Sequence, residues 1–279
     1  MTCFSRLCTL LVAAIFLSAA SDPVPIQAQE LLYVDDNASG ADDGSSWNDA
    51  YPNLQDALSA ANDEDVIAVA AGTYYPDIGE GIPVDDREAS FTITGAQDGL
   101  EVYGGYAGDE NISLGNLKLD GRDFEVNETT LSGDVDGTPD DKSGNSYHVV
   151  YLDGVTGADI TSVTRIDGFT ISSGNADTNN ENNGGGLYCG GDNGNECSPT
   201  ISNVVFVENN AEYGGAIYNG GNDGISNTSI VNASFADNQA SDSGGAIYND
   251  GYSGESSPSI SNASFTNNTT GRGSGGGYL

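Results

Sequence analysis

The stretch from Phe206 to Ser234 reads FVENNAEYGGAIYNGGNDGISNTSIVNAS, and a similar stretch begins again at Phe235. Two motifs recur here and keep step with each other along the chain. The first, of the type Gly-Gly-Ala-Ile-Tyr, starts every 30 or 31 residues, at Gly184, Gly214, Gly244 and, in a rougher copy, Gly275. The second, Phe-x-x-Asn, starts every 29 or 30 residues, at Phe206, Phe235 and Phe265. A constant, glycine-punctuated period of this length predicts a solenoid of stacked repeats.

Each repeat also carries three groups of apolar residues. One coil places them at Ile201, at Val204 and Phe206, and at Ile217, and the next at Ile230, at Ala233 and Phe235, and at Ile247. This spacing predicts an all-β parallel β-helix with three strands per coil. About eight coils at roughly 4.8 Å each would give a rod about 40 Å long. A flat β-sandwich is the alternative, although it does not need near-identical units.

Asparagine and glycine stand at the corners between these apolar groups. Both tolerate the left-handed backbone conformation that sharp corners need. The asparagines of the second motif, Asn209, Asn238 and Asn268, are expected to lie one above another. Such a ladder lets side-chain amides hydrogen-bond along the axis of the solenoid.

Residues 29–65 are predicted to form an N-terminal cap. Leu31–Val34 is a short apolar strand, and Pro52 precedes an amphipathic helix with apolar residues at 54, 57, 58 and 61. A helix at this place covers the open end of a solenoid, where backbone groups and apolar side chains would otherwise be exposed. We expect the β-helix to occupy residues 66–279, with regular repeats from about residue 166.

Residues 1–28 are predicted to be a signal peptide. Arg6 precedes an apolar run from Leu7 to Ala20, which is too short for a membrane span. Cleavage is compatible with Ala20 or Ala28, and Ala28 is favoured because residues 23–25 look like a spacer. A short N-terminal membrane anchor is the alternative. No later stretch is apolar enough to cross a bilayer as a helix, so we expect an exported protein, extracellular or associated with the outer membrane.

The charge balance is strongly acidic, with 42 Asp and Glu against 7 Lys and Arg and a net charge of −35. Nucleic acid and acidic phospholipid surfaces are therefore unfavourable partners, because binding phosphates needs clustered cations. Such a surface repels itself at low salt, whereas at molar salt the screening length falls to about 3 Å. We therefore expect a halophilic source, with calcium loading by clustered carboxylates as the competing interpretation.

Four cysteines divide into two pairs. Cys3 and Cys8 belong to the predicted signal peptide, and Cys189 and Cys197 remain across a loop of Gly, Asp and Asn. In an oxidising compartment this second pair is a candidate disulfide, with two free thiols as the alternative. A zinc site is disfavoured because His148 is the only histidine.

The two repeat motifs resemble the polymorphic outer membrane protein repeat over about Ile166 to Leu279. The start of the chain is similar to secreted bacterial right-handed parallel β-helix proteins of the pectate-lyase-like superfamily. The segments that carry this similarity are Tyr33-Val34-Asp35, Trp47, Leu54-Gln55-Asp56-Ala57-Leu58, Ala71-Gly72-Thr73-Tyr74 and Val102-Tyr103-Gly104-Gly105-Tyr106. The resemblance implies a single-stranded, right-handed β-helix. It does not specify function, because the superfamily includes adhesins, lyases, glycosidases and proteins of no known role.

Candidate catalytic residues are few. Polysaccharide lyases of this superfamily use an Arg or Lys base beside acidic calcium ligands, and Arg165 with Asp167 is the pair that looks like this arrangement, although a surface ion pair is the simpler interpretation. Polygalacturonase-like hydrolases pair aspartates with Gly-His-Gly and Arg-x-Lys, and only Asp140-Asp141 is present here. His148 is interpreted as a strand residue. We predict no catalytic residue and no cofactor.

One turn gathers four carboxylates that are weak candidates for calcium ligands, namely Asp134, Asp136, Asp140 and Asp141. Carboxylate oxygens suit calcium, but the turn lacks the full twelve-residue calcium loop. A solvated acidic loop is the alternative.

Tyrosine follows the inward apolar residue of each glycine-rich motif. Because side chains alternate along a strand, Tyr188, Tyr218 and Tyr248 are predicted to form an exposed aromatic row that contacts glycans or another protein. A ladder that only stiffens the rod is the alternative.

We therefore expect a secreted or cell-surface β-helix for adhesion or extracellular interaction, with an extracellular glycan or protein surface as partner. Because the chain stops within a repeat at Leu279, we also expect it to be a fragment of a longer surface protein. The alternative function is a carbohydrate-active enzyme, either a polysaccharide lyase or a glycoside hydrolase, on the same fold.

Overall fold

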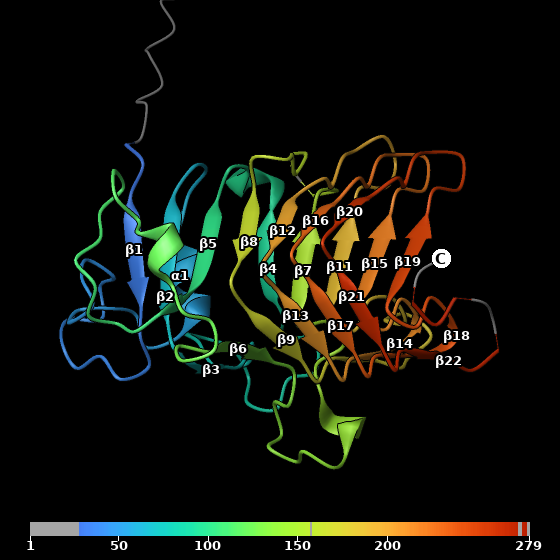
Figure 1. Cartoon of the computed structure of the whole chain (residues 1–279), viewed down its shortest axis with the longest axis horizontal. Helices are drawn as coiled ribbons and strands as arrows, with labels where there is room; N and C mark the ends of the chain where they lie inside the picture. The colour runs from blue at the N-terminus through green and yellow to red at the C-terminus, as the bar shows by residue number, and fades with distance from the viewer. Residues whose placement is uncertain (1–27, 157, 273–274, 278–279) are drawn as a thin grey trace, which may run out of the picture.

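The computed structural model describes residues 28–156, 158–272 and 275–277. Within these residues the strands form four sheets, and the strands of every sheet run parallel (Figure 1). Sheet A contains β1 (Leu31–Val34), β2 (Val66–Ala70), β5 (Glu101–Tyr106), β8 (Arg165–Asp167), β12 (Thr200–Ser202), β16 (Ser229–Val231) and β20 (Ser259–Ser261). Sheet B contains β3 (Gly72–Tyr74), β6 (Thr129–Ser132), β9 (Thr170–Ser172), β13 (Val205–Val207), β17 (Ser234–Ala236) and β21 (Ser264–Thr266).

Two further sheets complete the cylinder. Sheet C contains β4 (Phe91–Thr94), β7 (Val150–Asp153), β11 (Leu187–Gly190), β15 (Ile217–Gly220) and β19 (Ile247–Asp250). Sheet D is shorter and contains β10 (Asn175–Ala176), β14 (Asn210–Tyr213), β18 (Gln239–Ser243) and β22 (Thr269–Thr270). Each regular coil gives one strand to sheets A, B, D and C in turn, and the following coil pairs with it. The chain is therefore a right-handed parallel β-helix, as the sequence predicted.

Apolar side chains at equivalent positions fill the interior. The ring centroids of Phe206 and Phe235 lie 5.1 Å apart, and those of Phe235 and Phe265 lie 4.8 Å apart, with nearly parallel planes. Ile201 and Ile230 are likewise paired in register and fully buried. The predicted superposition of equivalent phenylalanines is thus confirmed, and each coil buries its apolar side chains against the coil beneath it.

The prediction of three strands per coil is wrong, because sheet D adds a fourth. Its inward residues are the alanines Ala176, Ala211 and Ala240, which are all buried. A single alanine between two asparagine- or glycine-rich corners is a weak apolar signal, so the pattern of larger apolar residues did not predict this strand. Small side chains also suit a short face that connects two wider ones.

The predicted asparagine ladder is present at the corner between sheets B and D, where Asn209 and Asn238 are buried and Asn268 is half-buried. Asn209 Nδ2 donates to Asn238 Oδ1 at 3.1 Å, and Asn238 Nδ2 donates to Asn268 Oδ1 at 2.9 Å. The same amides donate to the main-chain carbonyls of Ile171 and Phe206. A second ladder lies at the corner between sheets A and B. There Asn203, Asn232 and Asn262 have φ of 53°, 54° and 52°, the left-handed conformation expected of corner asparagines.

At the N-terminal end, α1 (Leu54–Ala60) contacts β1 and β4. Asn53 caps it by accepting a hydrogen bond from the Asp56 N–H, so the helix starts one residue after the cap, and Leu54, Ala57 and Leu58 point into the core. The strand β1 pairs with β2 and is the first strand of sheet A. The predicted signal peptide, residues 1–28, lies outside the described residues except for Ala28.

Long excursions replace short corners in the first half of the chain. They span residues 77–89, 107–128 and 133–146, and two of them carry short 3-10 turns, η2 (Leu119–Gly121) and η3 (Lys142–Gly144). A further turn, η1 (Gly95–Gln97), follows β4. These excursions project from the β-helix near α1 and below sheet B (Figure 1), and they position the candidate site.

Candidate functional site

Tyrosines form a row on the outer face of sheet C. Strand register places Tyr151, Tyr188, Tyr218 and Tyr248 opposite one another, and Thr92 of β4 continues the row. The next residues along the strands, such as Ile93 and Leu152, are buried. Because side chains alternate along a strand, the tyrosines point away from the interior.

The tyrosine rings stack on one another along the axis of the β-helix. Successive centroids lie 5.0, 5.4 and 5.7 Å apart, with planes within 10° of parallel. Each ring therefore covers a face of its neighbour, and the edges of the rings, more than their faces, point away from the β-helix. Tyr218, in the middle of the stack, is only 8 % exposed, so the prediction of an exposed row is wrong for this residue. Tyr188 and Tyr248 are half-buried.

Glycines make room for two of these rings. A Cβ atom at Gly190 would lie 2.9 Å from Tyr188 Cε1, and one at Gly220 would lie 3.1 Å from Tyr218 Cε1. The rings thus lie over their own strands. Burial, followed by nearby aspartates, raises the pKa of Tyr188 and Tyr218 above its ordinary value, and burial raises the pKa of Tyr151 to about 12. All three hydroxyls stay neutral at ordinary pH.

The sequence analysis missed Tyr151, the first ring of the stack. It belongs to β7, before the regular repeat begins, and no Gly-Gly-Ala-Ile motif precedes it. The sequence signal that could have identified it is the pair Val150-Tyr151. As in Ile217-Tyr218, an inward apolar residue is followed directly by a tyrosine that points outward.

His148 lies beside the stack, where its side chain is nearly buried. Its ring is 5.7 Å from that of Tyr151 and 5.5 Å from that of Tyr188. Nδ1 lies 3.1 Å from the Gly184 carbonyl, and Nε2 lies 3.0 Å from a Glu181 carboxylate oxygen. Both partners are hydrogen-bond acceptors, so the ring can donate to one of them when it is neutral and to both when it is protonated. The hydrogen bond from His148 lowers the pKa of Glu181.

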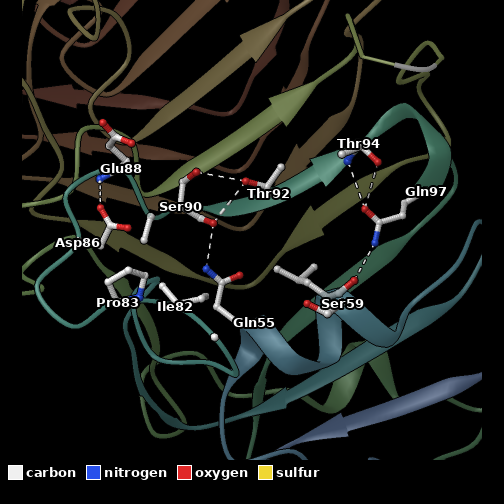
Figure 2. A pocket seen from close by; sticks show the side chains of 13 residues that line it. Gln55, Ser59, Ile82, Pro83, Asp86, Glu88, Ser90, Thr92, Thr94 and Gln97 are labelled. Carbon is white, nitrogen blue, oxygen red and sulfur yellow. Dashed lines mark hydrogen bonds between the residues drawn. The ribbon is translucent and has the colours of Figure 1, made fainter.

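A groove runs along the outside of β4, between α1 and the excursion at 77–89 (Figure 2). Its larger hollow has a volume of about 560 Å³. The lining residues that carry its chemistry are Gln55, Ser59, Asp86, Glu88, Thr92 and Gln97. A second hollow of about 410 Å³ shares Glu88, Ser90 and Thr92 with it and adds Tyr147, His148, Tyr151 and Glu181. We call the two hollows together the cap groove. It lies where the tyrosine stack meets the N-terminal cap.

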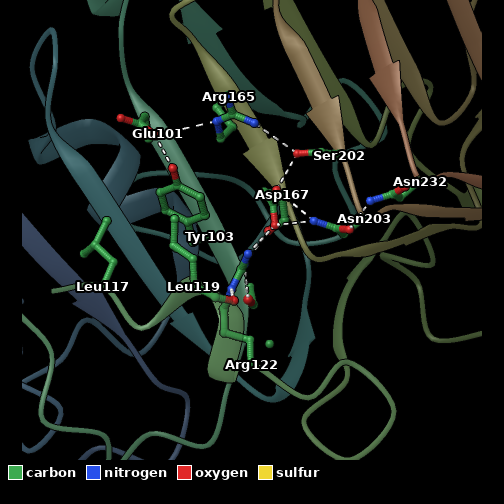
Figure 3. A network of polar contacts seen from close by, with 12 residues as sticks. Glu101, Tyr103, Leu117, Leu119, Arg122, Arg165, Asp167, Ser202, Asn203 and Asn232 are labelled. Atoms are coloured by element: carbon green, nitrogen blue, oxygen red, sulfur yellow. Dashed lines mark hydrogen bonds and ion pairs between the residues drawn. The ribbon is translucent and has the colours of Figure 1, made fainter. Parts of the chain in front are cut away.

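A separate polar network lies on the outer face of sheet A (Figure 3). Arg122, from the excursion at 107–128, forms a nearly buried ion pair with Asp167 and donates to the Gly104 carbonyl at 2.8 Å. Ser202 and Asn203 donate to the same carboxylate. The guanidinium also lies over the ring of Tyr103, 5.1 Å from its centroid. Every group is engaged, so the network fastens the excursion to sheet A.

Arg165 does not form the predicted pair with Asp167. Its Nε lies 3.7 Å from Glu101 in the preceding coil, and its Nη1 donates to Ser202 Oγ at 3.2 Å. Both residues of the ion pair are about one-third exposed. Because β5 and β8 pair in register, Glu101 lies directly opposite Arg165, whereas Asp167 is taken by Arg122.

Three of the four candidate calcium ligands, Asp134, Asp136 and Asp141, accept local hydrogen bonds within their own turn. Asp134 and Asp136 accept from the Thr138 N–H at 2.9 and 3.2 Å. Asp141 caps η3 by accepting from the Ser143 N–H, which lowers its pKa, and Asp140 is exposed. Among the residues that the structure describes, no group of three or more His, Cys, Asp or Glu side chains is arranged to hold a metal ion.

Cys189 and Cys197 are joined in the structure, with an S–S distance of 2.02 Å. Cys189 lies in β11 and points into the core, so the bond ties sheet C to the corner that leads to sheet A.

Comparison with known protein families gives one match. Residues 232–250 match the Chlamydia polymorphic membrane protein repeat. The matched segment runs from β17 to β19 and contains both Phe235-x-x-Asn238 and the motif that starts at Gly244. No curated protein matches the chain, and no solved structure does either. The repeat match points to a bacterial surface or outer-membrane association.

Over the described part of the chain, none of the helices has the length and apolar character that crossing a bilayer requires.

Proposed function

We propose that this chain is a surface-displayed β-helix that acts in adhesion or another extracellular interaction, through the outer face of sheet C. The observation that carries the proposal is the tyrosine stack together with the cap groove. These features lie outside the core, and four of the five strands of sheet C carry a tyrosine at the same outward position.

The neighbouring walls differ from this face. The outward row of sheet B carries small residues where it crosses the regular coils, namely Val205, Ser234 and Ser264. Aromatic residues with a polar hydroxyl favour contact surfaces, because they combine a large apolar area with hydrogen bonding. The match to a polymorphic membrane protein repeat supports a location where such a surface meets other molecules.

The alternative proposal, that the chain is an enzyme, is weaker because the candidate catalytic side chains already have partners within the protein. The cationic groups nearest to lyase-like positions are engaged, Arg122 with Asp167 and Arg165 with Glu101. The His148 side chain is nearly buried, and both of its ring nitrogens face acceptor oxygens of the protein. The side wall therefore offers a surface for contact more readily than a group poised to transfer a proton.

The test compares two walls of the same molecule. The full chain, displayed on a non-adherent bacterium, is assayed for retention on immobilised cell envelopes and on glycan-coated surfaces. Changing Tyr188, Tyr218 and Tyr248 to Ser is expected to abolish retention. The matched control changes Val205, Ser234 and Ser264 of sheet B to Ala and is expected to leave retention unchanged. Thermal melting of both variants verifies folding, and equal retention by folded tyrosine and control variants would refute the proposal.

A further inference from the structure

We propose that the cap groove binds a saccharide chain built of neutral or amino sugars. This inference rests on the proposed function, since it names a ligand class for the same face of the molecule. It is carried by three features of the groove: an aromatic ring with no stacked ring on one side, an open main-chain donor and acceptor, and a lining that contains carboxylates but no Lys or Arg among its described residues.

Tyr151 provides the aromatic face. One side of its ring stacks on Tyr188 at 5.0 Å. His148 is nearly equidistant from both rings, so it lies beside the pair, and among the described residues no further ring stacks on the other side of Tyr151. Toward that side the row continues with Thr92, whose small side chain leaves the 410 Å³ hollow that both residues line. An uncovered ring face in a hollow suits stacking against the apolar face of a sugar ring.

Thr92 provides the main-chain groups. Phe91 N–H donates to the Val149 carbonyl, so the groups of Phe91 point toward β7, and the alternate residues point to the open edge of sheet C. Two glutamines occupy the neighbouring edge positions. Gln55 donates to the Ser90 carbonyl at 3.0 Å, and Gln97 accepts from the Thr94 N–H at 3.2 Å. The N–H and C=O of Thr92 lie between them and open into the larger hollow.

This arrangement favours a saccharide over a peptide. Adding a strand to a sheet edge uses main-chain hydrogen bonds along several residues. Here the glutamines close the edge on both sides, so a peptide could pair at one residue only. The rest of the lining offers hydroxyls, such as those of Ser59, Ser90 and Thr94 (Figure 2), which suit sugar hydroxyls. The volume of each hollow falls within the rough range of 300–1,000 Å³ for ligand sites.

Charge selects among saccharides. Asp86, Glu88 and Glu181 line the groove, and no Lys or Arg is among its described lining residues. The guanidinium of Arg87 lies over the ring of the lining residue Tyr147, 4.4 Å from its centroid, and is engaged with the carbonyls of Asn145 and Asn175 and with Asp177. A uronic acid polymer would meet carboxylates without a cation to pair with, whereas neutral sugars or protonated amines avoid this repulsion.

The experiment titrates the purified chain with four probes and measures heat or NMR shifts. The probes are tetramers of N-acetylglucosamine, glucosamine, galacturonate and lysine. We expect the first or second to bind and the third not to bind. Y151S is expected to weaken binding by about tenfold or more, because it removes the stacking face. The matched control is Y252S, which removes an exposed tyrosine ring that is outside the stack and does not line the groove, and its affinity should equal that of the wild type.

A second variant covers the case in which Y151S fails to fold. T92Y adds a ring in register with the stack, so it keeps the fold and fills the hollow, and binding should fall while the melting temperature is maintained. T92S should bind as the wild type does. The inference is overturned if neither sugar tetramer binds, if galacturonate or lysine tetramers bind better, or if T92Y binds as tightly as the wild type. Retention of displayed cells that persists without saccharide binding would leave the proposed function standing and remove only this inference.

Discussion

The coils between residues 166 and 272 and the coils between residues 28 and 165 share sheets A, B and C, but their corners differ. In the later coils short corners repeat with asparagine ladders, and sheet D runs continuously from β10 to β22. In the earlier coils the excursions at 77–89, 107–128 and 133–146 take the place of short corners. The repeating half stabilises itself by stacking identical groups. The irregular half supplies most of the lining of the cap groove, and it supplies Arg122, whose network reaches Asp167, Ser202 and Asn203 in the regular coils.

This difference shows how the molecule divides stability from recognition. A stacked position tolerates little variation, since each residue is a partner to the coils on both sides. An excursion leaves the stack and is free to bring side chains distant in sequence together. Arg122 and Asp167 are 45 residues apart, and Gln55 and Ser90 are 35 apart. The following substitutions test this division, starting with the one expected to have the largest effect.

Removing a ring from the middle of the phenylalanine stack should have the largest effect. Phe235 is fully buried between Phe206 and Phe265. F235A should lower the free energy of unfolding by about 4 kcal/mol, through lost burial and the cavity that remains. F265A, at a partly exposed position, should cost about half as much or less. Denaturant unfolding measures both, and equal losses would contradict the stacking argument.

Breaking the buried ion pair of the irregular half should come next. R122A leaves Asp167 without its charge partner, although Ser202 and Asn203 still donate to it, so a loss of about 3 kcal/mol is expected. The control is R165A, whose pair with Glu101 is longer and partly exposed and should contribute at most about 1 kcal/mol. Protease cleavage within residues 107–128 should increase in R122A only. An intact excursion in R122A would show that other contacts hold it.

The two asparagine ladders give a third comparison within the regular coils. N238A leaves the buried Asn209 N–H without its acceptor and removes the hydrogen bonds of Asn238 to the Asn209 amide and the Phe206 carbonyl, for an expected loss of about 2 kcal/mol. N232G acts on the exposed ladder, where a φ of 54° suits glycine, and should change stability by about 0.5 kcal/mol or less. Thermal and denaturant melts test this order. A reversed order would mean that corner conformation outweighs the buried hydrogen bonds.

The pair of His148 and Glu181 should have the smallest effect, because the Glu181 side chain is 46 % exposed. The pKa of Glu181 is lowered from its ordinary value of 4.5 by the hydrogen bond from His148. Its contribution to stability is therefore present in full above pH 4.5 and is lost as pH falls through the lowered value. E181Q should melt slightly below the wild type near neutral pH, and the difference should vanish toward about pH 3. If the difference in melting temperature between E181Q and the wild type did not change with pH, the charge of Glu181 would not be its cause.

Periodicity made the regular coils predictable. Phe206, Phe235 and Phe265 could be placed one above another because a fixed spacing in sequence becomes a fixed position on the coil. The ladder of Asn209 and Asn238 followed from the same argument. Sheet D was not predicted, because its inward residue in each coil is a single alanine. The burial of Tyr218 was not predicted either, because strand alternation gives the direction of a side chain and not the position of neighbouring rings.

The candidate site was less predictable, since its residues share no period. Tyr188, Tyr218 and Tyr248 were found from the repeat, whereas Tyr151, Thr92 and the cap groove were not. The partners of Arg122 and Arg165 depend on which coil each residue joins, and the varied lengths of the excursions hide that register.

The sequence by itself determined that this chain winds into a parallel β-helix, because equal spacing of apolar residues allows one coil to bury its neighbour at every turn. Only the tertiary structure decided what the walls present. It set which face of each tyrosine is covered, which edge groups of β4 remain open, and which carboxylates meet a cation. These properties depend on contacts between segments of unequal length, and the residues that make such contacts do not recur at a fixed spacing in the sequence.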